Sequence, residues 1–182
     1  MKGALLAFVL PLAAAAALAA PAPEPGAQSP SVRAFFTPGD DVVKVIVGRI
    51  GAAGTSVQVA AYLFTNRRLS VALAKAARRG VRVEIVGDAG RYEFGGLPVL
   101  RELERAGARV YLRGGLAAFH HKIVIIDGES PAPVVITGSF NFTQAAQASN
   151  AENIVVISGD RALAMRFVRE FERHRDASSR IQ

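Results

Sequence analysis

The chain has 182 residues, of which 51% are hydrophobic, and a formal net charge of +7. Its length fits one globular domain, and its composition excludes an intrinsically disordered protein. The absence of cysteine excludes a disulfide scaffold, a cysteine-ligated metal site and a thiol nucleophile. The excess of Lys and Arg over Asp and Glu, 22 against 15, favours an anionic partner such as nucleic acid or an acidic membrane surface.

The first 19 residues have the pattern of a signal peptide. Lys2 gives a positive start, residues 3–19 are apolar and rich in alanine, and Ala17-Leu18-Ala19 has the small-x-small form of a cleavage site. A retained membrane anchor is the alternative, but the stretch falls short of the ~20 apolar residues that a spanning helix needs. We therefore expect a secreted or periplasmic protein with no stable membrane association after cleavage.

Residues 20–31 are rich in proline and predict a linker ahead of a domain over 32–182. In chain order, the hydrophobic patterns predict strands over 32–36, 57–64, 81–86, 109–112, 122–126, 134–137 and 154–157. They predict helices after Asp40 as N-cap, over 69–79, around 99–106 and after Asp160 as N-cap, with a loop over 87–96 and a helical turn over 143–148. This alternation indicates an α/β sandwich with helices on both faces of the sheet.

A polar pair at the start of an apolar strand points to chemistry. His120 and Lys122 are two residues apart, so they share one face of the strand, whereas His121 faces the other way. Burying Lys122 without a partner is costly, and a bound anion would supply that partner. We expect His121 to pack or lie at the surface, with a place at the cleft rim as the alternative, and His174 to be a solvated helix end.

Polar residues after the following strands fit the same ligand. Gly138 allows backbone to approach a ligand closely, and Ser139 and Asn141 can donate hydrogen bonds to phosphate oxygens. For Ser139, capping of the helical turn over 143–148 is an equal alternative. Glu152 could accept a proton from one nitrogen of a histidine, which leaves the other nitrogen free to attack.

These residues resemble the HKD signature of the phospholipase D superfamily, at His120-x-Lys122-x-x-x-x-Asp127 and Gly138-Ser139-x-Asn141. The runs 138–143 and Asn150-x-Glu152-Asn153 are similar to its small bacterial endonuclease branch. The resemblance covers nearly all of the chain after residue 19. The chain departs from the family in the ten residues between Asp127 and Gly138, which are more than is usual. The turn-like run 128–133 predicts a lengthened hairpin loop there.

The resemblance implies a phospholipase D-like α-β-α sandwich in a single domain with a central mixed sheet. Because the family builds one site from two HKD motifs and this chain has one, it also implies a homodimer with a shared active site. One His120 would attack phosphorus and form a covalent phosphohistidine. The partner's His120 would protonate the leaving oxygen and then activate water.

The other motif residues receive roles from the same resemblance. Lys122, Asn141 and Ser139 would bind the phosphoryl oxygens, and Glu152 would orient the histidine. Asp127 joins the catalytic group by its place in the motif, although a structural role near the strand end is favoured for it. No metal or other cofactor is implied, because the two lysines of the dimer would replace the cation that many nucleases use.

Three functions remain for this chain. The first is a metal-independent phosphodiesterase, most simply a nonspecific bacterial endonuclease that cleaves DNA and also RNA. The alternative is a lipid phosphodiesterase of phospholipase D type, which would want an exposed apolar rim or anchor. A catalytically silent nucleic-acid-binding module is the third, and the intact motif argues against it. A basic cluster is more typical of a solvated helix face than of a substrate surface; it comprises Arg67, Arg68, Lys75, Arg78, Arg79 and Arg82.

Overall fold

A computed structural model describes residues 29–92 and 97–181, so the predicted signal peptide and most of the predicted linker lie outside the described residues. The strands are β1 (Ser31–Thr37), β2 (Ser56–Ala61), β3 (Arg82–Asp88), β4 (Arg109–Arg113), β5 (Lys122–Ile126), β6 (Val134–Gly138), β7 (Glu152–Ser158) and β8 (Ser179–Arg180). The helices are α1 (Val42–Gly51), α2 (Arg67–Arg78), α3 (Ala89–Arg91), α4 (Leu97–Arg105), α5 (Gln144–Ala148) and α6 (Arg161–Asp176). Within the described ranges, no helix has the length and apolar character needed to cross a membrane.

The strands form one mixed sheet in the order β1-β7-β6-β5-β2-β3-β4-β8. Strands β2, β3 and β4 run parallel, and every other neighbouring pair is antiparallel. The end of β2 meets the start of β5, because Ala61 pairs with Lys122. The end of β6 and the start of β7 reach the same edge, where Gly138 pairs with Ile154. This pairing confirms the predicted mixed sheet and gathers the motif residues at one edge.

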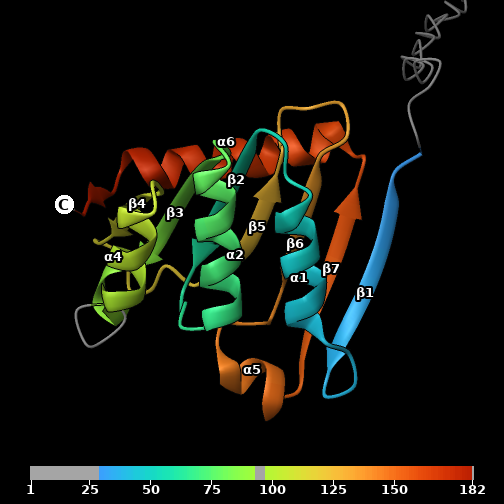
Figure 1. Cartoon of the computed structure of the whole chain (residues 1–182), viewed down its shortest axis with the longest axis horizontal. Coiled ribbons are helices and arrows are strands. Elements are labelled where there is room, and N and C mark those ends of the chain that lie inside the picture. The colour runs from blue at the N-terminus through green and yellow to red at the C-terminus, as the bar shows by residue number, and fades with distance from the viewer. Residues whose placement is uncertain (1–28, 93–96, 182) are drawn as a thin grey trace, which may run out of the picture.

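Helices cover both faces of this sheet (Figure 1). Helices α1, α2 and α4 lie on one face, where Val43 and Leu73 belong to the larger apolar cluster. Helix α6 lies on the other face, where Val168 packs in a second cluster. Successive residues of β5 serve the two clusters in turn, Val124 the first and Ile125 the second, as the alternation of side chains along a strand requires. The predicted single-domain sandwich is confirmed.

The start of α1 differs by one residue from the prediction. Asp41, and not Asp40, is the N-cap, because its carboxylate accepts a hydrogen bond of 2.8 Å from the Lys44 amide. The carboxylate of Asp40 instead accepts from the Phe36 amide at 2.8 Å and closes the turn after β1. For α6 the predicted N-cap is correct, since Asp160 accepts from the Leu163 amide at 2.9 Å.

Most other elements differ from the predicted ranges by one or two residues at an end; α2, for example, begins at Arg67 and not at residue 69, and β7 begins at Glu152 and not at residue 154. Two differences bear on the site. Strand β2 ends at Ala61, three residues early, and Phe64 makes only an isolated bridge with Phe142. Strand β3 continues into the predicted loop as far as Asp88, and the short helix α3 follows it. Both differences occur at the edge of the sheet that carries the motif residues, where the chain leaves the regular ladder to build a site.

The hairpin between β5 and β6 holds the extra residues of the motif. Ile126 pairs with Val134, so residues 127–133 form the connection. This connection lies at the opposite end of β5 from Lys122. The longer loop therefore extends the far edge of the sheet and leaves the spacing of the motif residues at the near edge unchanged.

Candidate active site

His120 and Lys122 lie together at the start of β5. His120 is exposed, and Lys122 is buried, with 8% of its surface accessible. The Lys122 ammonium lies 3.1 Å from Nδ1 of His120 and donates a hydrogen bond of 2.9 Å to the His120 carbonyl. The pair therefore shares one side of the chain, as the spacing predicts, with the imidazole open to solvent.

The charge on Lys122 is costly where it stands. Burial lowers the pKa of the Lys122 amine, and the negative charge of Glu152 partly offsets this effect. A charged lysine can only donate hydrogen bonds, so Nδ1 of His120 is the acceptor in this arrangement. Attack through Nε2 needs the other tautomer, with the hydrogen on Nδ1. A phosphate placed beside Lys122 would draw the ammonium away from Nδ1 and permit that change.

Tyr62 forms a wall of the site that sequence reasoning missed. Its ring centroid lies 4.3 Å from that of His120 and 5.1 Å from the Lys122 ammonium. Nε of Arg91 also donates to the Tyr62 hydroxyl, and the guanidinium lies 4.9 Å from the ring centroid. Tyr62 thus fixes the histidine beside two cations. The pairing of β2 with β5 brings it there, and nothing local in the sequence signals it.

Asp88 positions two segments of this site from the end of β3. It is 7% exposed, and its two carboxylate oxygens accept from the Phe119 amide at 2.5 Å and the Arg91 amide at 3.0 Å. One buried carboxylate therefore ties the residue before His120 to the turn that carries Arg91. Sequence reasoning placed Asp88 in an ordinary loop, and a lone aspartate there carries no signal of this role.

Ser139 and Asn141 follow β6 at the same edge. The Ser139 hydroxyl oxygen accepts a hydrogen bond of 3.1 Å from the Asn153 amide, which leaves its own hydrogen for another acceptor. The alternative role for Ser139 as a helix cap is wrong, because Thr143 caps α5 by accepting from the Ala146 amide at 3.1 Å. Oδ1 of Asn141 is buried and has no hydrogen-bond partner in the described part of the chain. A buried polar atom of this kind is costly unless a ligand or solvent satisfies it.

The structure gives Gly138 a different role from the predicted one. A Cβ atom built on Gly138 would lie 2.2 Å from the Asn153 carbonyl oxygen. The same carbonyl accepts from the amides of Ser139 at 3.1 Å and Phe140 at 3.3 Å. Glycine is required here because β7 passes so close to the chain, and not because a ligand does. This close contact between Gly138 and β7 fixes the backbone from which Ser139 and Asn141 extend.

Glu152 lies near the pair without touching His120. It opens β7, and its Oε1 accepts a hydrogen bond of 2.9 Å from the Asn150 side chain. Its charge reaches Lys122, whose pKa it raises. Within the described residues no hydrogen bond joins Glu152 to His120. The orienting role of Glu152 stays a prediction.

Asp127 lies outside the group that the other motif residues form. It follows the far end of β5, about 16 Å along the strand from Lys122 at the usual rise per residue. Its carboxylate accepts from the amides of Gly54, Thr55 and Ser56 at 2.7 to 2.9 Å and from the Thr55 hydroxyl at 2.7 Å. Burial alone would raise the pKa of Asp127, but these hydrogen bonds outweigh it and lower the pKa. The structure does not bring Asp127 to the catalytic group, and its contacts are those of a structural residue.

The prediction for His174 is wrong. His174 is buried, with 6% of its surface accessible, although it belongs to the last turn of α6. Its ring centroid lies 4.9 Å from that of Phe119 and 5.4 Å from that of His121, and its Nε2 lies 2.9 Å from the Glu170 carboxylate. The last turn of α6 rests on the sheet face opposite Lys122, so its inward residue is covered. His121 packs here, as predicted.

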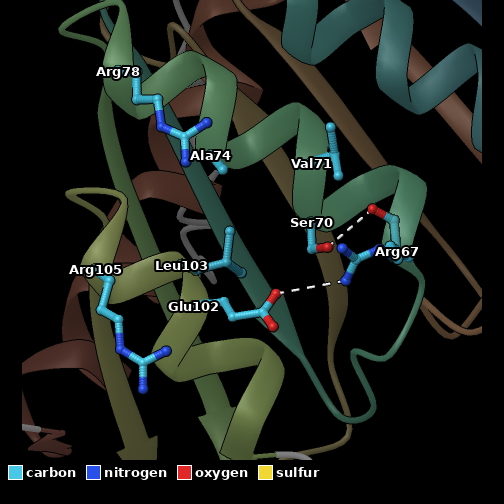
Figure 2. A pocket seen from close by; sticks show the side chains of 8 residues that line it. All are labelled: Arg67, Ser70, Val71, Ala74, Arg78, Glu102, Leu103 and Arg105. Atoms are coloured by element: carbon cyan, nitrogen blue, oxygen red, sulfur yellow. Dashed lines mark hydrogen bonds and ion pairs between the residues drawn. The ribbon is translucent and has the colours of Figure 1, made fainter.

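Arginines line a hollow between α2 and α4 (Figure 2). This hollow has a volume of about 340 Å³ and carries Arg67, Arg78 and Arg105 around a single carboxylate, Glu102. Arg67 and Glu102 form a largely exposed ion pair of 3.7 Å. Such pairs contribute little to stability. Five members of the predicted basic cluster therefore lie on α2 or at its end and are exposed, whereas Arg82 opens strand β3 and pairs with Glu129 at 3.1 Å.

The family of the chain follows from its match over residues 46–175 to the family model for the cardiolipin synthase, PLD-like domain. Together with the sandwich fold and the His–Lys pair, this match shows that the chain belongs to the phospholipase D superfamily, as predicted. The protein is thus a phospholipase D-like hydrolase acting on phosphodiester bonds.

Particular relatives include lipid enzymes by name. The chain is 36% identical over 140 residues to "Phospholipase D" of Rickettsia felis, a match that covers 77% of this chain and 67% of that protein. It is 29% identical over 158 residues to "Mitochondrial cardiolipin hydrolase" of Canis lupus familiaris, a match that covers 87% of this chain and 60% of that protein. The chain therefore spans roughly three fifths to two thirds of the length of these relatives.

Solved structures of similar size agree with the fold over their whole length. Nuc from Salmonella typhimurium, described as a phospholipase D family member, superposes with a TM-score of 0.78 and 30% identity. That match covers 85% of this chain and 99% of Nuc. NucT from Helicobacter pylori gives a TM-score of 0.77, with 84% and 100% covered, at 22% identity, and so supports the fold alone.

Proposed function

We propose that the protein is a metal-independent, nonspecific endonuclease that cleaves DNA, with RNA as a second substrate, and that it works as a homodimer. The observation that carries the proposal is the pairing of an exposed His120 with a buried Lys122 at an open edge of the sheet. Tyr62, Ser139 and Asn141 border that edge. The pair supplies one nucleophile and one cation, which is half of what the two-step reaction requires.

An uncovered apolar face supports the homodimer. Helix α6 packs on β2 through β6, and Ile157 of β7 packs against the apolar cluster beneath it, so the open part of this face lies on β1. Val32 and Phe36 on this face are 66% and 58% exposed, and they pair with Ile157 and Asn153 of β7. Exposed apolar side chains in a continuous stretch are typical of an interaction surface. The stretch ends at the active-site edge, since the Asn153 amide contacts Ser139, and a second copy seated there would bring two sites together.

The first chemical step forms a covalent intermediate. Nε2 of His120 attacks phosphorus, a P–N bond forms, and the P–O bond to the leaving group breaks. The leaving oxygen takes a proton from the partner's His120, which acts as general acid. Lys122 and the Asn141 side-chain amide stabilise the charge on the non-bridging oxygens, and Ser139 donates its free hydroxyl hydrogen.

The second step releases the phosphate end. The now neutral imidazole, the partner's His120, accepts a proton from water as the water oxygen attacks phosphorus. The P–N bond breaks and restores His120 with its electron pair. Glu152 would accept a hydrogen bond from Nδ1–H of His120 during both steps, which keeps Nε2 free and stabilises the cation that forms when His120 bonds to phosphorus.

Charge and size favour nucleic acid as the substrate. The chain carries a net charge of +7, and Arg91 lies beside the site on Tyr62. Binding to nucleic acid without sequence preference depends mainly on phosphate neutralisation, so cleavage should fall steeply with salt. The match to Nuc over 99% of its length adds to this choice. A lipid phosphodiesterase is the second candidate, because the relatives in Rickettsia and dog bear lipid-enzyme names.

Export to the periplasm or the cell exterior completes the proposal. It depends on the signal-peptide pattern of residues 1–19, in which a positive start precedes an alanine-rich apolar run and a small-x-small cleavage motif. Amino-terminal sequencing of the protein recovered from the periplasm of an expressing bacterium would test it. A chain beginning at residue 20 is expected, and a membrane-bound chain that keeps Met1 would contradict it.

The decisive test compares nucleic acid with lipid under chelation. We expect the protein to degrade plasmid DNA in excess EDTA, whereas His120→Ala protein does not. Parallel assays follow release of headgroups from phosphatidylcholine and hydrolysis of cardiolipin. Loss of DNA cleavage in EDTA would contradict the metal-free mechanism. Lipid turnover above the His120→Ala background, with no DNA cleavage, would replace the nuclease by the lipid enzyme.

Light scattering tests the shared site. We expect the mass of a dimer and expect Phe36→Glu, on the uncovered face, to give monomers with little nuclease activity. Val71→Glu is the matched control, because Val71 is also exposed, at 42%, but lies on α2. An active monomer would overturn the shared site.

A further inference from the structure

Two of the three histidines meet a carboxylate on the face of β5 away from His120. His121 precedes β5, and Glu170 and His174 are four residues apart on α6. Nε2 of His174 lies 2.9 Å from the Glu170 carboxylate, and Nε2 of His121 lies 3.9 Å from the same oxygen. Donor atoms of all three residues lie within 4.8 Å of one another. The nuclease mechanism uses none of them.

The cluster is partly preformed and accessible. His174 is 6% exposed, its ring packs on Phe119, and its Nδ1 is buried with no hydrogen-bond partner in the described chain. Rings held in this way lose little freedom when they bind a ligand. His121 and Glu170 also line a groove of about 720 Å³ between the sheet and α6, which gives an ion a path from solvent.

We propose that His121, Glu170 and His174 bind a first-row divalent transition ion, with Zn²⁺ as the best fit, at a site separate from the phosphodiester-cleaving one. Two imidazoles and a carboxylate are ligands that Zn²⁺ accepts, with a fourth position left to water or a solute from the groove. The proposal does not depend on the nuclease activity.

The distances suit zinc after small side-chain shifts. Zn–N and Zn–O distances near 2.0–2.1 Å place tetrahedral ligand atoms about 3.3 Å apart. The two measured separations from the Glu170 oxygen, 2.9 and 3.9 Å, lie on either side of that value.

Arg173 is the resident competitor for this site. Its guanidinium donates to both oxygens of Glu170 and lies 3.0 Å from Nε2 of His174. The Arg173 side chain is 63% exposed, so it can swing into solvent when an ion takes its place. Arg166 and Arg169 line the same groove and oppose a dication. Nδ1 of His174 also has no hydrogen-bond acceptor among the described residues to orient the ring. We therefore expect metal binding about 10–100-fold weaker than at a site where each ligating histidine has such a partner.

Titration calorimetry with Zn²⁺, and the visible absorption of bound Co²⁺, test the site directly. We expect one ion per chain, affinity reduced at least about tenfold in His121→Asn and Glu170→Gln, and tighter binding in Arg173→Ala. His174 is buried, and its replacement risks unfolding the end of α6, so the two more exposed ligands are the ones to change. The matched control is Glu172→Gln, a carboxylate on the same helix that pairs with Arg175.

The outcome separates this site from the active site. His120→Ala should bind the ion as the unaltered protein does. Binding lost in His120→Ala but kept in Glu170→Gln would assign the ion to the active site and overturn the proposal. Saturable binding absent even from Arg173→Ala would also overturn it. Because the readout is metal binding, failure of the nuclease proposal would leave this test intact.

Discussion

The two ends of β5 treat their polar groups in opposite ways. At the Asp127 end, one carboxylate accepts four hydrogen bonds from residues 54–56, and burial is fully compensated. At the Lys122 end, an ammonium is buried, an imidazole is exposed and Oδ1 of Asn141 has no partner among the described residues. The Asp127 carboxylate is thus a group satisfied by the fold, whereas the Lys122 ammonium, whose hydrogen bonds among the described residues go only to His120, is a group left without an opposite charge in contact with it. A single sequence motif spans both kinds.

Removal of His120 should have the largest effect and fall on activity alone. His120→Ala removes the proposed nucleophile, so we expect turnover of plasmid DNA to fall by at least about 10³-fold with the melting temperature nearly unchanged. Gel assays and calorimetry measure the two quantities. Glu129→Ala, an exposed change in the hairpin at the other end of β5, should leave both as they are. Residual cleavage above a tenth would show that the nucleophile is elsewhere.

Lys122→Met should be the next largest change. It keeps roughly the length of the side chain and removes the charge that we propose binds the phosphoryl oxygens, so we expect kcat to fall about 10²–10³-fold. The buried position should accept the apolar side chain without loss of stability. Denaturant titration beside single-turnover kinetics checks both. Lower stability with unchanged kcat would show that Lys122 stabilises the fold and takes no part in catalysis. The contrast between the Lys122 end and the Asp127 end of β5 would then be lost.

Asp127→Ala should show the reverse pattern. It removes acceptors from backbone amides, so we expect the free energy of unfolding to fall by about 1–3 kcal/mol while kcat per folded molecule is kept. The lowered pKa gives the effect a pH dependence. Its contribution is complete above the ordinary aspartate pKa of about 3.9 and is lost as pH falls through the lower folded value.

Urea titrations from neutral to acid pH check the Asp127 prediction. The difference in the free energy of unfolding between the unaltered protein and the variant should disappear at acid pH. A variant of normal stability with lost activity would return Asp127 to the catalytic group.

Glu152→Gln should have the smallest effect of these changes, a shift in the pH dependence of activity. Glu152 raises the pKa of Lys122, so removal of its charge should lower that pKa and move the alkaline limb of the activity profile to lower pH. Profiles of kcat/KM against pH measure the limb. Asn150→Ala, which removes the hydrogen bond to Glu152 and keeps the charge, is the control. An alkaline limb at unchanged pH would mean that Glu152 does not affect catalysis through the pKa of Lys122 and acts on His120 alone.

The sequence predicts the regular elements well, because hydrophobic alternation and capping residues are local signals. Strand β5 matches its predicted range, and Asp160 caps α6 as expected. The start of α1 was placed wrongly because Asp40 and Asp41 are equally good caps in sequence. The hydrogen bond from the Phe36 amide, which decides between them, depends on the turn after β1.

The site was predictable where it lies in one motif and not where it depends on tertiary pairing. His120 and Lys122 share a strand face by their spacing, which the structure retains. Tyr62 and Asp88 reach the site through the pairing of β2 with β5 and with β3, which no local pattern encodes. His174 was misjudged because a helix end is usually solvated, and the packing of α6 on the sheet reverses that.

The long β5–β6 hairpin offers a handle for engineering. Its tip, at Glu129, Pro131 and Ala132, is exposed to solvent, and it lies a full strand length from His120. An affinity tag, a fluorophore or a surface linkage placed there would report on or immobilise the enzyme without crowding its substrate. Extra chain length at such a turn costs little. The departure from the family motif thus marks the point where this scaffold can be extended.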